Sequence, residues 1–433
     1  MPRNHPQANP LSRLKTLTPL DIRACHTLSE LVAGLKNCAF GANMLGSVVE
    51  TFVRWTEDKQ NLPIIVYDGE LGNPLSDLLT QMYQRGTIRE VMTSNDLRSA
   101  TTPSMLDATD RVLVIGPYTL RNAEILHAHP VENILYVNKE RQCTPGMARD
   151  GSFTNVCFSA PELVLPIMDQ VERERHGAEP VSPTAFLRSL APYGGVATTV
   201  SAGSEVARKM FTARDCRVML TLSGAMTAAQ LGGVVRVMME DRMVHGIVAT
   251  GALMAHGLVE GLGLKHLMHD PSIPDHVLVQ WGGNRITTVV EPESNFDVID
   301  EVVSAVLNKI SGKQPIAPSE LLRKIGQYLN QKYPNNRSIL GTAARMGIPV
   351  FVPAFFDSEL GNDVTVANQL RRRAKRPRIV IDQEADNHNL IQHSLGTKKL
   401  GIFTVGGGVP RNWAQNLGPL VNLFNNRADS KFD

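Results

Sequence analysis

The stretch DCRVMLTLSGAMTAAQLGGVVRVMMEDRMVHGIVATGALMAHG, residues 215 to 257, decides the fold class. It contains a short, largely apolar run at residues 218 to 222 and a second one at residues 246 to 249. Short runs of this kind, each followed by a small polar residue and a glycine, are typical of strands that helices cover on both faces. Strands of that type belong to parallel sheets, so we expect the two runs to share one sheet.

The segment between the two runs has the spacing of a helix. Leu231, Val234, Val235 and Met238 recur at i, i+3, i+4 and i+7, which predicts one buried stripe, and the polar residues from Glu240 onward end it. Strand, glycine turn, helix and strand form a βαβ unit, whose crossover is right-handed. The sequence therefore predicts an α/β fold built on a parallel sheet.

The glycine turns after the two strands form the first candidate binding site. In an open parallel sheet the ligand crevice lies beyond the carboxyl ends of the strands, where both turns would meet. Gly224 lets a ligand approach the backbone closely, and the free N–H groups at the start of the next helix favour a phosphate. There is no GxGxxG, so a glycine turn that only reverses the chain is an equally good interpretation. The turn residues are Ser223, Gly224, Ala225, Met226 and Thr227, and Thr250, Gly251 and Ala252.

Composition limits the class of protein. The chain has 433 residues, which is too long for one ordinary core, and its formal charge of +2 gives no reason to expect a nucleic-acid or membrane partner. The N-terminus MPRNHPQANP lacks the apolar core of a signal peptide, and no apolar run reaches the ~18 residues of a membrane span, so we expect a cytoplasmic location. The five cysteines are scattered without a CxxC, which favours buried free thiols.

The first half of the chain looks like a weaker copy of the second half. Residues 27 to 58 predict two helices, a strand follows at residues 62 to 67, and residues 183 to 222 repeat this order. Glu205 lies 155 residues after Glu50, and the same shift aligns the two pairs of helices. An internal duplication and a coincidence of two similar α/β units both explain the pattern, and we favour the duplication.

We therefore expect two α/β domains, residues 1 to 180 and residues 181 to 433, joined through the polar segment ERERHGAEPVSP. The turn Asp68-Gly69-Glu70 of the first domain is acidic and unsuited to phosphate, so we expect that domain to be structural or regulatory. Its expected strands are residues 62–67, 88–92, 111–115, 133–137 and 154–158. In the second domain we expect further strands at residues 349–352, 378–381 and 402–405, and a single strand before the helix in GGNRITTVVEPESNFDVIDEVVSAVLNKI.

Four blocks in this order carry a resemblance to a known family. They are SGAMTAAQL, GGNRI with VEPE, SILGTAARMGIPVFVPAFFDSELG, and TKKLGIFTVGGGVPRNW. They resemble successive motifs of the deoxyhypusine synthase family, closest to its prokaryotic, homospermidine-synthase-like branch, over most of residues 183 to 420. The resemblance implies a Rossmann-like fold, NAD as cofactor, and transfer of an aminobutyl group from a spermidine-like polyamine to an acceptor amine. It also implies a homotetramer with sites between subunits.

The resemblance also assigns site residues. Matching positions make Ser223, Gly224, Ala225, Met226, Thr227, Thr250, Gly251, Ala252 and Asp357 the expected NAD contacts. A carboxylate at a strand end can accept hydrogen bonds from ribose hydroxyls, which suits Asp357. The alternative is that Asp357 only caps its own loop.

The substrate half departs from the family pattern. The family's adjacent glutamates fall on Ala255 and His256, and its later loop aspartate and histidine fall on Asn362 and Asn412. The expected substrate-binding residues are His256, Asn362, Asp363 and Asn412, and His256 is also the candidate catalytic residue. The Ser-Trp-Gly-Lys segment that supplies the family's imine-forming lysine does not occur in this sequence, and Lys431 has no such context.

Two alternatives to ordinary transfer follow from those departures. One is a catalytically inactive family member that serves as a nucleotide-binding subunit or scaffold, in a homo-oligomer or with a paralogue. The other is an NAD-dependent enzyme of altered chemistry that uses His256.

Two further patterns suggest ligands but have simpler interpretations. A short stretch holds His256, His266, His269, Asp270 and His276. Its spacing contains no HExxH, so we expect solvated loop histidines and no metal. The basic run at residues 371 to 378 predicts a solvated helix end rather than a site for an anion.

Overall fold

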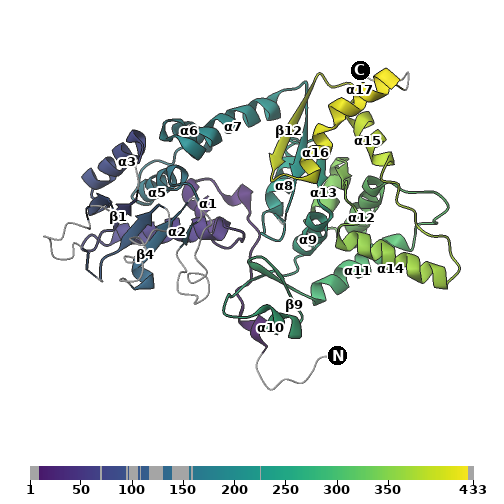
Figure 1. Cartoon of the computed structure of the whole chain (residues 1–433), viewed down its shortest axis with the longest axis horizontal. Helices are drawn as coiled ribbons and strands as arrows, with labels where there is room; N and C mark the ends of the chain where they lie inside the picture. The colour runs from purple at the N-terminus through teal and green to yellow at the C-terminus, as the bar shows by residue number, and fades with distance from the viewer. Residues whose placement is uncertain are drawn as a thin grey trace. The chain divides into compact units, whose positions relative to one another are not determined.

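The computed structural model describes residues 9–68, 71–93, 96, 106–107, 109–116, 130–138, 156–157, 159–224 and 226–427. The chain forms two compact units (Figure 1). The N-terminal unit comprises Asp21–Val206 and Asp270–Pro274, and the C-terminal unit comprises the described residues up to Leu20, Ala207–His269 and the chain from Asp275 onward. The expected domain boundary at residue 180 and the internal duplication stay predictions.

The N-terminal unit contains a five-stranded sheet in the order β2-β1-β3-β4-β5, with every neighbouring pair parallel. Its strands are β1 (Ile64–Tyr67), β2 (Glu90–Thr93), β3 (Val112–Ile115), β4 (Ile134–Val137) and β5 (Val156–Cys157). All five overlap the strands expected from the sequence, and residues 154, 155 and 158 of the last one lie outside the described residues. The helices of this unit are α1 (Leu28–Leu35), α2 (Ala42–Glu57), α3 (Asn73–Gln84), α5 (Pro161–Arg175) and α6 (Pro183–Ser189), with short 3-10 turns at Ile22–Ala24, Val131–Asn133 and Ala191–Tyr193.

The C-terminal unit is built on a four-stranded sheet in the order β11-β7-β6-β12, again entirely parallel. The strands are β6 (Cys216–Leu222), β7 (Gly246–Ala249), β11 (Val350–Phe351) and β12 (Lys399–Val405). Leu222 pairs with both Ala249 and Val405, so the three longest strands end at one level. The predicted βαβ unit and parallel sheet are confirmed.

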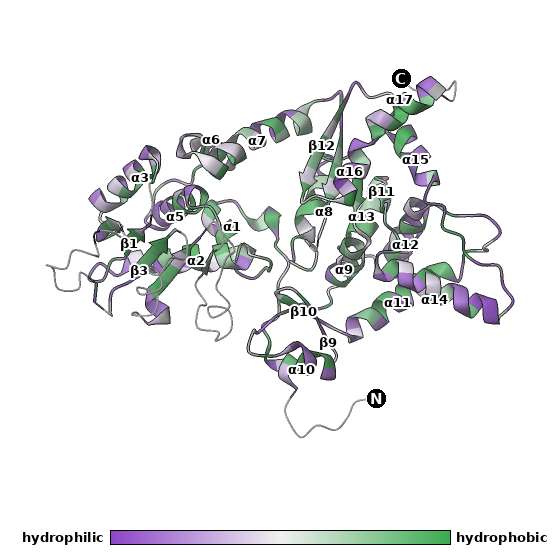
Figure 2. Ribbon diagram, in the orientation of Figure 1, coloured by the Kyte–Doolittle hydropathy of each residue, from purple (hydrophilic) through white to green (hydrophobic). Residues whose placement is uncertain are grey.

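Helices cover both faces of this sheet. Val218, Leu220 and Leu222 of β6 belong to one apolar cluster, whereas Met219 between them belongs to another. This alternation follows from the two-residue period of a strand. The first face is covered by α8 (Gly232–Glu240), α9 (Gly251–Gly261), α11 (Ser294–Leu307), α12 (Pro318–Lys332), α13 (Ile339–Met346) and α14 (Glu359–Arg373), and the second by α15 (Ala385–Ser394), α16 (Val409–Gln415) and α17 (Leu417–Arg427). Figure 2 shows the strands of this unit largely in hydrophobic green. The fold is α/β with a Rossmann-like parallel sheet.

Helix α8 buries a different stripe from the predicted one. Its buried residues are Gly232, Val235 and Met239, whereas Val234 and Met238 are only partly buried. Gln230 has a positive φ of 67°, and Leu231 is the non-helical N-cap rather than the first residue of the stripe. The helix therefore begins one residue later than the spacing suggested.

The segment expected to form one strand before α11 forms a hairpin. β9 (Gly283–Ile286) and β10 (Val289–Pro292) are antiparallel, and with β8 (Leu267–Met268) they make a three-stranded sheet. The chain reverses at Thr287, whose φ of 53° is unusual for a threonine, so no glycine signals the turn. The remaining elements are a 3-10 turn at Pro10–Arg13, α7 (Gly195–Thr212) and α10 (Asp275–Gln280).

The strand expected at residues 378 to 381 is absent from the described sheets. Only an isolated bridge joins Ile381 to Ile316. The Asn368 side chain of α14 donates to the Ile379 carbonyl at 2.9 Å and accepts from the Ile379 N–H at 2.8 Å. The Asn368 side chain thus satisfies the backbone N–H and carbonyl of Ile379, which a neighbouring strand would otherwise pair with.

The exposure of side chains tests the expectations for the cysteines and for the basic run. Cys38, Cys157 and Cys216 are buried free thiols as predicted, Cys25 is partly exposed, and Cys143 lies outside the described residues. The basic end of α14 is exposed and is coloured purple in Figure 2, except that Arg371 is buried and donates to the Leu307 and Pro377 carbonyls. Among the described residues, no helix has the length and apolar character needed to cross a bilayer.

Candidate functional site

The turns after β6 and β12 are joined at the carboxyl edge of the C-terminal sheet. The Ser223 hydroxyl accepts a hydrogen bond from the Gly407 N–H at 2.8 Å, and the Ser223 N–H donates to the Val405 carbonyl at 3.1 Å. A Cβ added to Gly406 would lie 2.0 Å from the Ser223 oxygen, so this contact requires glycine. The predicted glycine turn and the triple glycine therefore form one surface.

The turns after β7 and β11 meet beside them. The Thr250 N–H donates to the Leu222 carbonyl at 3.3 Å, which holds the start of α9 against the end of β6. A Cβ on Gly251 would lie 2.4 Å from both Cβ and Oγ of Ser358. Only glycine allows the loop that carries Asp357 to lie this close to α9. The sheet thus brings together four loops that are far apart in the sequence.

Backbone at this edge is open to a ligand. Gly224 has a positive φ of 78°, and a Cβ added there would meet no described atom within 4 Å. The same holds for Gly408, with a φ of 69°, and a Cβ added to Gly407 would also meet no described atom within 4 Å. A conformation that favours glycine, with free space around it, suits a ligand that lies directly on the main chain.

Two helices start at this edge. Thr250 caps α9 by accepting from the Leu253 N–H at 3.3 Å, and Ser358 caps α14 by accepting from the Gly361 N–H at 3.3 Å. Ser358, and not Asp357, supplies the side-chain cap of α14. Asp357 is exposed, and its carboxylate has no hydrogen bond within the described part of the chain. Its oxygens are therefore available to an outside donor.

The other expected NAD contacts differ in accessibility. Thr227 is fully buried, and its hydroxyl donates to the Leu253 carbonyl at 2.8 Å, so this side chain is already engaged in joining the β6 turn to α9. Met226 packs against the apolar cluster of the unit, and Ala252 is partly buried. Ala225 lies outside the described residues.

Acidic groups gather at the start of α14. Asn362 is exposed and Asp363, one residue further along this helix, is partly buried, while Asn412 is exposed in the first turn of α16. Burial, together with the negative charges of Asp300 and Glu359, raises the pKa of Asp363 to about 6. One carboxylate oxygen each of Asp363 and Glu359 is buried without a hydrogen bond in the described structure. These acids would gain from a cationic partner.

His256 is buried in a polar cluster rather than solvated. Its Nδ1 lies 2.7 Å from Oε2 of Glu291, and Nε2 of His266 lies 3.5 Å from the same oxygen. Burial disfavours the charged imidazole, but the hydrogen bond and charge of Glu291, with the charge of Glu359, raise the pKa of His256. The expectation of solvated histidines is wrong for His256, because α9 is buried on nearly all sides, and for His266, which is fully buried just before β8.

Glu291 was not expected in this cluster. It stands in the apolar sequence VVEP of β10, and its side chain is fully buried. A carboxylate among buried valines needs a partner, because an unpaired buried charge is very costly. That reasoning would have flagged Glu291 from the sequence, although not the identity of its partners.

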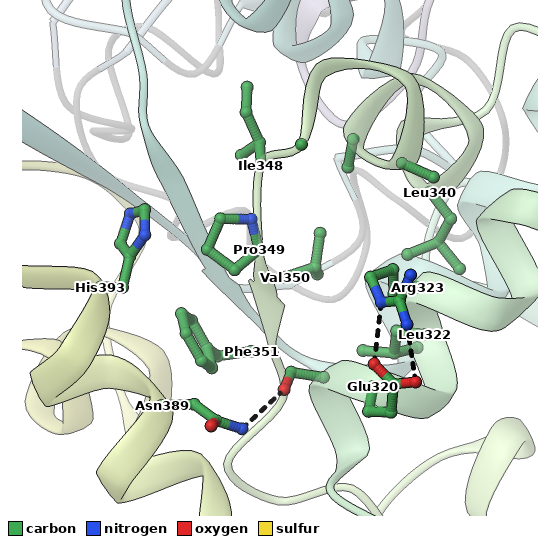
Figure 3. A pocket seen from close by; sticks show the side chains of 14 residues that line it. Glu320, Leu322, Arg323, Leu340, Ile348, Pro349, Val350, Phe351, Asn389 and His393 are labelled. Atoms are coloured by element: carbon green, nitrogen blue, oxygen red, sulfur yellow. Dashed lines mark hydrogen bonds and ion pairs between the residues drawn. The ribbon is translucent and has the colours of Figure 1, made fainter.

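One described cavity of the C-terminal unit lies elsewhere. It has a volume of about 360 Å³ and is lined in part by Pro349 and Val350, which begin β11. In Figure 3, His393 lies on one side of β11 and the ion pair of Glu320 with Arg323 lies on the other. The cavity is therefore near the amino ends of the strands, away from the glycine turns.

Comparison with known proteins places the chain in one family. The family profile described as deoxyhypusine synthase matches residues 185–431. "Probable deoxyhypusine synthase 2" of Archaeoglobus fulgidus is 31% identical over 219 residues, which cover 51% of this chain and 70% of that protein. A "Deoxyhypusine synthase-like protein" of Elusimicrobium minutum is 31% identical over 215 residues, covering 49% and 56% of the two chains. One of the same description from Caulobacter vibrioides is 26% identical over 270 residues, covering 62% and 72%. The chain belongs to the deoxyhypusine synthase family.

Proposed function

We propose that this chain uses NAD to transfer an aminobutyl group from a spermidine-like polyamine to an acceptor amine. Membership of the family supports this general reaction. The observation that carries the proposal is the open backbone at Gly224, next to the start of α9 at the carboxyl edge of a parallel sheet. Ligands of open α/β sheets bind at such an edge.

The residues at this edge fit a dinucleotide. The N–H groups of Gly251 and Ala252 open α9, where the helix dipole favours a phosphate, and Gly224 leaves room for it. Asp357 has an exposed carboxylate that can accept hydrogen bonds from ribose hydroxyls. We further assign Ser223, Ala225, Met226, Thr227 and Thr250 to the wall of this site. Bound NAD would supply a hydride acceptor.

The acidic groups at the start of α14 suit a polyamine. Ammonium groups form charge-assisted hydrogen bonds with carboxylates, and these are about twice as strong as neutral ones. We assign this role to Asp363 and its neighbour Glu359, each of which has a carboxylate oxygen without a partner in the described structure. Further contacts along the carbon chain of the substrate would come from the neutral amides of Asn362 and Asn412 and from the imidazole of His256, which can be neutral or protonated.

An inactive, nucleotide-binding family member is the second candidate. The positions that match the family's adjacent glutamates hold Ala255 and His256, whose exposed fractions are 2% and 6%. The buried His256 is already bonded to Glu291 and cannot replace two carboxylates as an anchor for an ammonium. The weakened anchor favours retained NAD binding with little turnover.

One experiment separates these possibilities. The protein is titrated with NAD in a calorimeter and then incubated with NAD and spermidine, while diaminopropane and the absorbance of reduced cofactor are measured. Release of diaminopropane supports the transferase, and NAD binding without release supports the nucleotide-binding subunit. An absence of NAD binding contradicts both.

We also propose that the chain assembles into an oligomer, either a homotetramer or a complex with a paralogue. Large apolar side chains on and just before α14 are exposed in the single chain: Phe356 (56%), Val366 (56%) and Leu370 (58%). Apolar side chains that gather at a surface favour association. Light scattering after gel filtration measures the mass, and a monomer at all concentrations would contradict this proposal.

A further inference from the structure

Three ionisable side chains of the C-terminal unit converge from three different elements. His256 lies on α9, His266 precedes β8, and Glu291 lies on β10. Their candidate ligand atoms all lie within 4.8 Å of one another. The three side chains are 7%, 0% and 0% exposed, so water hardly reaches them.

The cluster has hydrogen-bonding capacity that the described residues leave unused. Nε2 of His266 and Oε1 of Glu291 are buried and have no hydrogen-bond partner in the described structure. A buried polar group without a hydrogen bond is destabilising, so two in one cluster indicate a missing partner. Both atoms are of a type that coordinates metal ions.

We propose that His256, His266 and Glu291 bind one divalent transition-metal ion of the zinc class. Two imidazoles and one carboxylate form a ligand set that zinc uses, whereas magnesium and calcium prefer oxygen alone. Zinc ligands at about 2.0–2.1 Å lie about 3.3 Å apart in a tetrahedron. The two measured separations are 2.7 Å and 3.5 Å, so binding needs shifts of well under an ångström at these two pairs.

A second layer of contacts holds His266 in place. Nδ1 of His266 lies 2.9 Å from the side-chain amide of Gln230, which is itself buried. A metal-bound histidine usually donates from its other ring nitrogen to an acceptor. With Nε2 on the ion, Nδ1–H would donate to the Gln230 amide, which then has to present its oxygen in place of the nitrogen that faces Nδ1 here. The backbone is fixed as well, because the His266 carbonyl accepts from the Leu17 N–H at 2.9 Å and Asn295 donates to the Lys265 carbonyl at 3.0 Å.

Metal content tests the proposal directly and without reference to enzymatic activity. Protein prepared without a histidine tag is stripped with a chelator and dialysed against Zn²⁺ or Co²⁺, after which bound metal is measured by mass spectrometry. We expect one ion per chain, the visible absorption of tetrahedral Co²⁺, and a higher unfolding temperature with metal. X-ray absorption of the wild-type zinc form should show two imidazoles and one carboxylate.

Variants identify the ligands. His256→Ala, His266→Ala and Glu291→Gln should each abolish stoichiometric binding, and Gln230→Asn, whose shorter side chain cannot reach His266, should weaken it about tenfold or more. His276→Ala is the matched control, since His276 is exposed in the same stretch and should leave binding unchanged. If wild-type protein binds no zinc, the three side chains form only a hydrogen-bonded triad, and the proposal is overturned. Equal binding by correctly folded ligand variants would do the same.

Discussion

Replacing Glu260 by glutamine should stabilise the protein at alkaline pH. Glu260 lies at the end of α9, and its carboxylate accepts a hydrogen bond from the Gly232 N–H at the start of α8, at 3.1 Å. Burial raises the pKa of Glu260 from 4.5 to about 7, although the N–H groups of Gly232 and Gly233 and the charge of Arg236 oppose the shift. The folded protein therefore favours the protonated form of Glu260 over the charged form.

The sign and size of the effect follow from that shift. The folded state holds the Glu260 proton more tightly than the unfolded state, so stability falls as the pH rises from the unfolded pKa through about 7. The full shift corresponds to about 3 kcal/mol, and partial exposure of the side chain reduces the expected effect to about 1–3 kcal/mol. Glutamine keeps an oxygen for the Gly232 N–H but cannot ionise.

Urea unfolding of Glu260→Gln and wild type at pH 5 and pH 9 measures the difference. We expect similar stability at the lower pH and a more stable variant at the higher pH. Glu301→Gln, on the exposed side of α11, is the control and should not change the pH dependence. A variant that is less stable at pH 9, or a difference that does not depend on pH, would refute the reasoning.

Three other substitutions test the site and the packing around it. Gly251→Ala places a Cβ 2.4 Å from Ser358, so the loop that carries Ser358 must move. Calorimetry should show NAD affinity reduced about tenfold or more. An unchanged affinity would mean that the contact between Gly251 and Ser358 does not shape the NAD site. Asp357→Asn should weaken NAD binding about tenfold by removing a charged acceptor while leaving the urea midpoint unchanged, with Asp77→Asn, at an exposed position of α3, as the control. Gly326→Ala places a Cβ 2.2 Å from the Leu340 carbonyl oxygen, where α12 and α13 touch, and should cost about 1–3 kcal/mol in urea unfolding; a neutral change would mean that the helices can separate freely.

The parallel strands could be predicted because each is a short apolar run buried on both faces, as at Gly246–Ala249. The joining of the glycine turns followed from the same pattern, since parallel strands bring their carboxyl ends to one edge. The hairpin at Thr287 escaped prediction because its positive φ occurs without glycine or asparagine. The stripe on α8 was misjudged because the surrounding packing buries Gly232, Val235 and Met239, a face that the spacing of the apolar residues does not single out.

The polar cluster could not be predicted from local spacing. His256 and Glu291 are 35 residues apart, and only the packing of α9 against the neighbouring hairpin brings them within 2.7 Å. Sequence periodicity describes which face of an element is buried, but it does not state which polar groups meet inside. The positions of Gly251 and Ser358 show the same limit, because their close approach depends on two loops from distant parts of the chain.

The order of strands in the C-terminal sheet affects how the protein is made. β6 lies between β7 and β12, yet β12 leaves the ribosome more than 170 residues after β6, as Leu222 and Lys399 mark. During that interval one side of β6 has no neighbour, and an open strand edge invites pairing with other nascent chains. The β12 side of β6 can therefore be covered by its own neighbour only after translation has passed Val405.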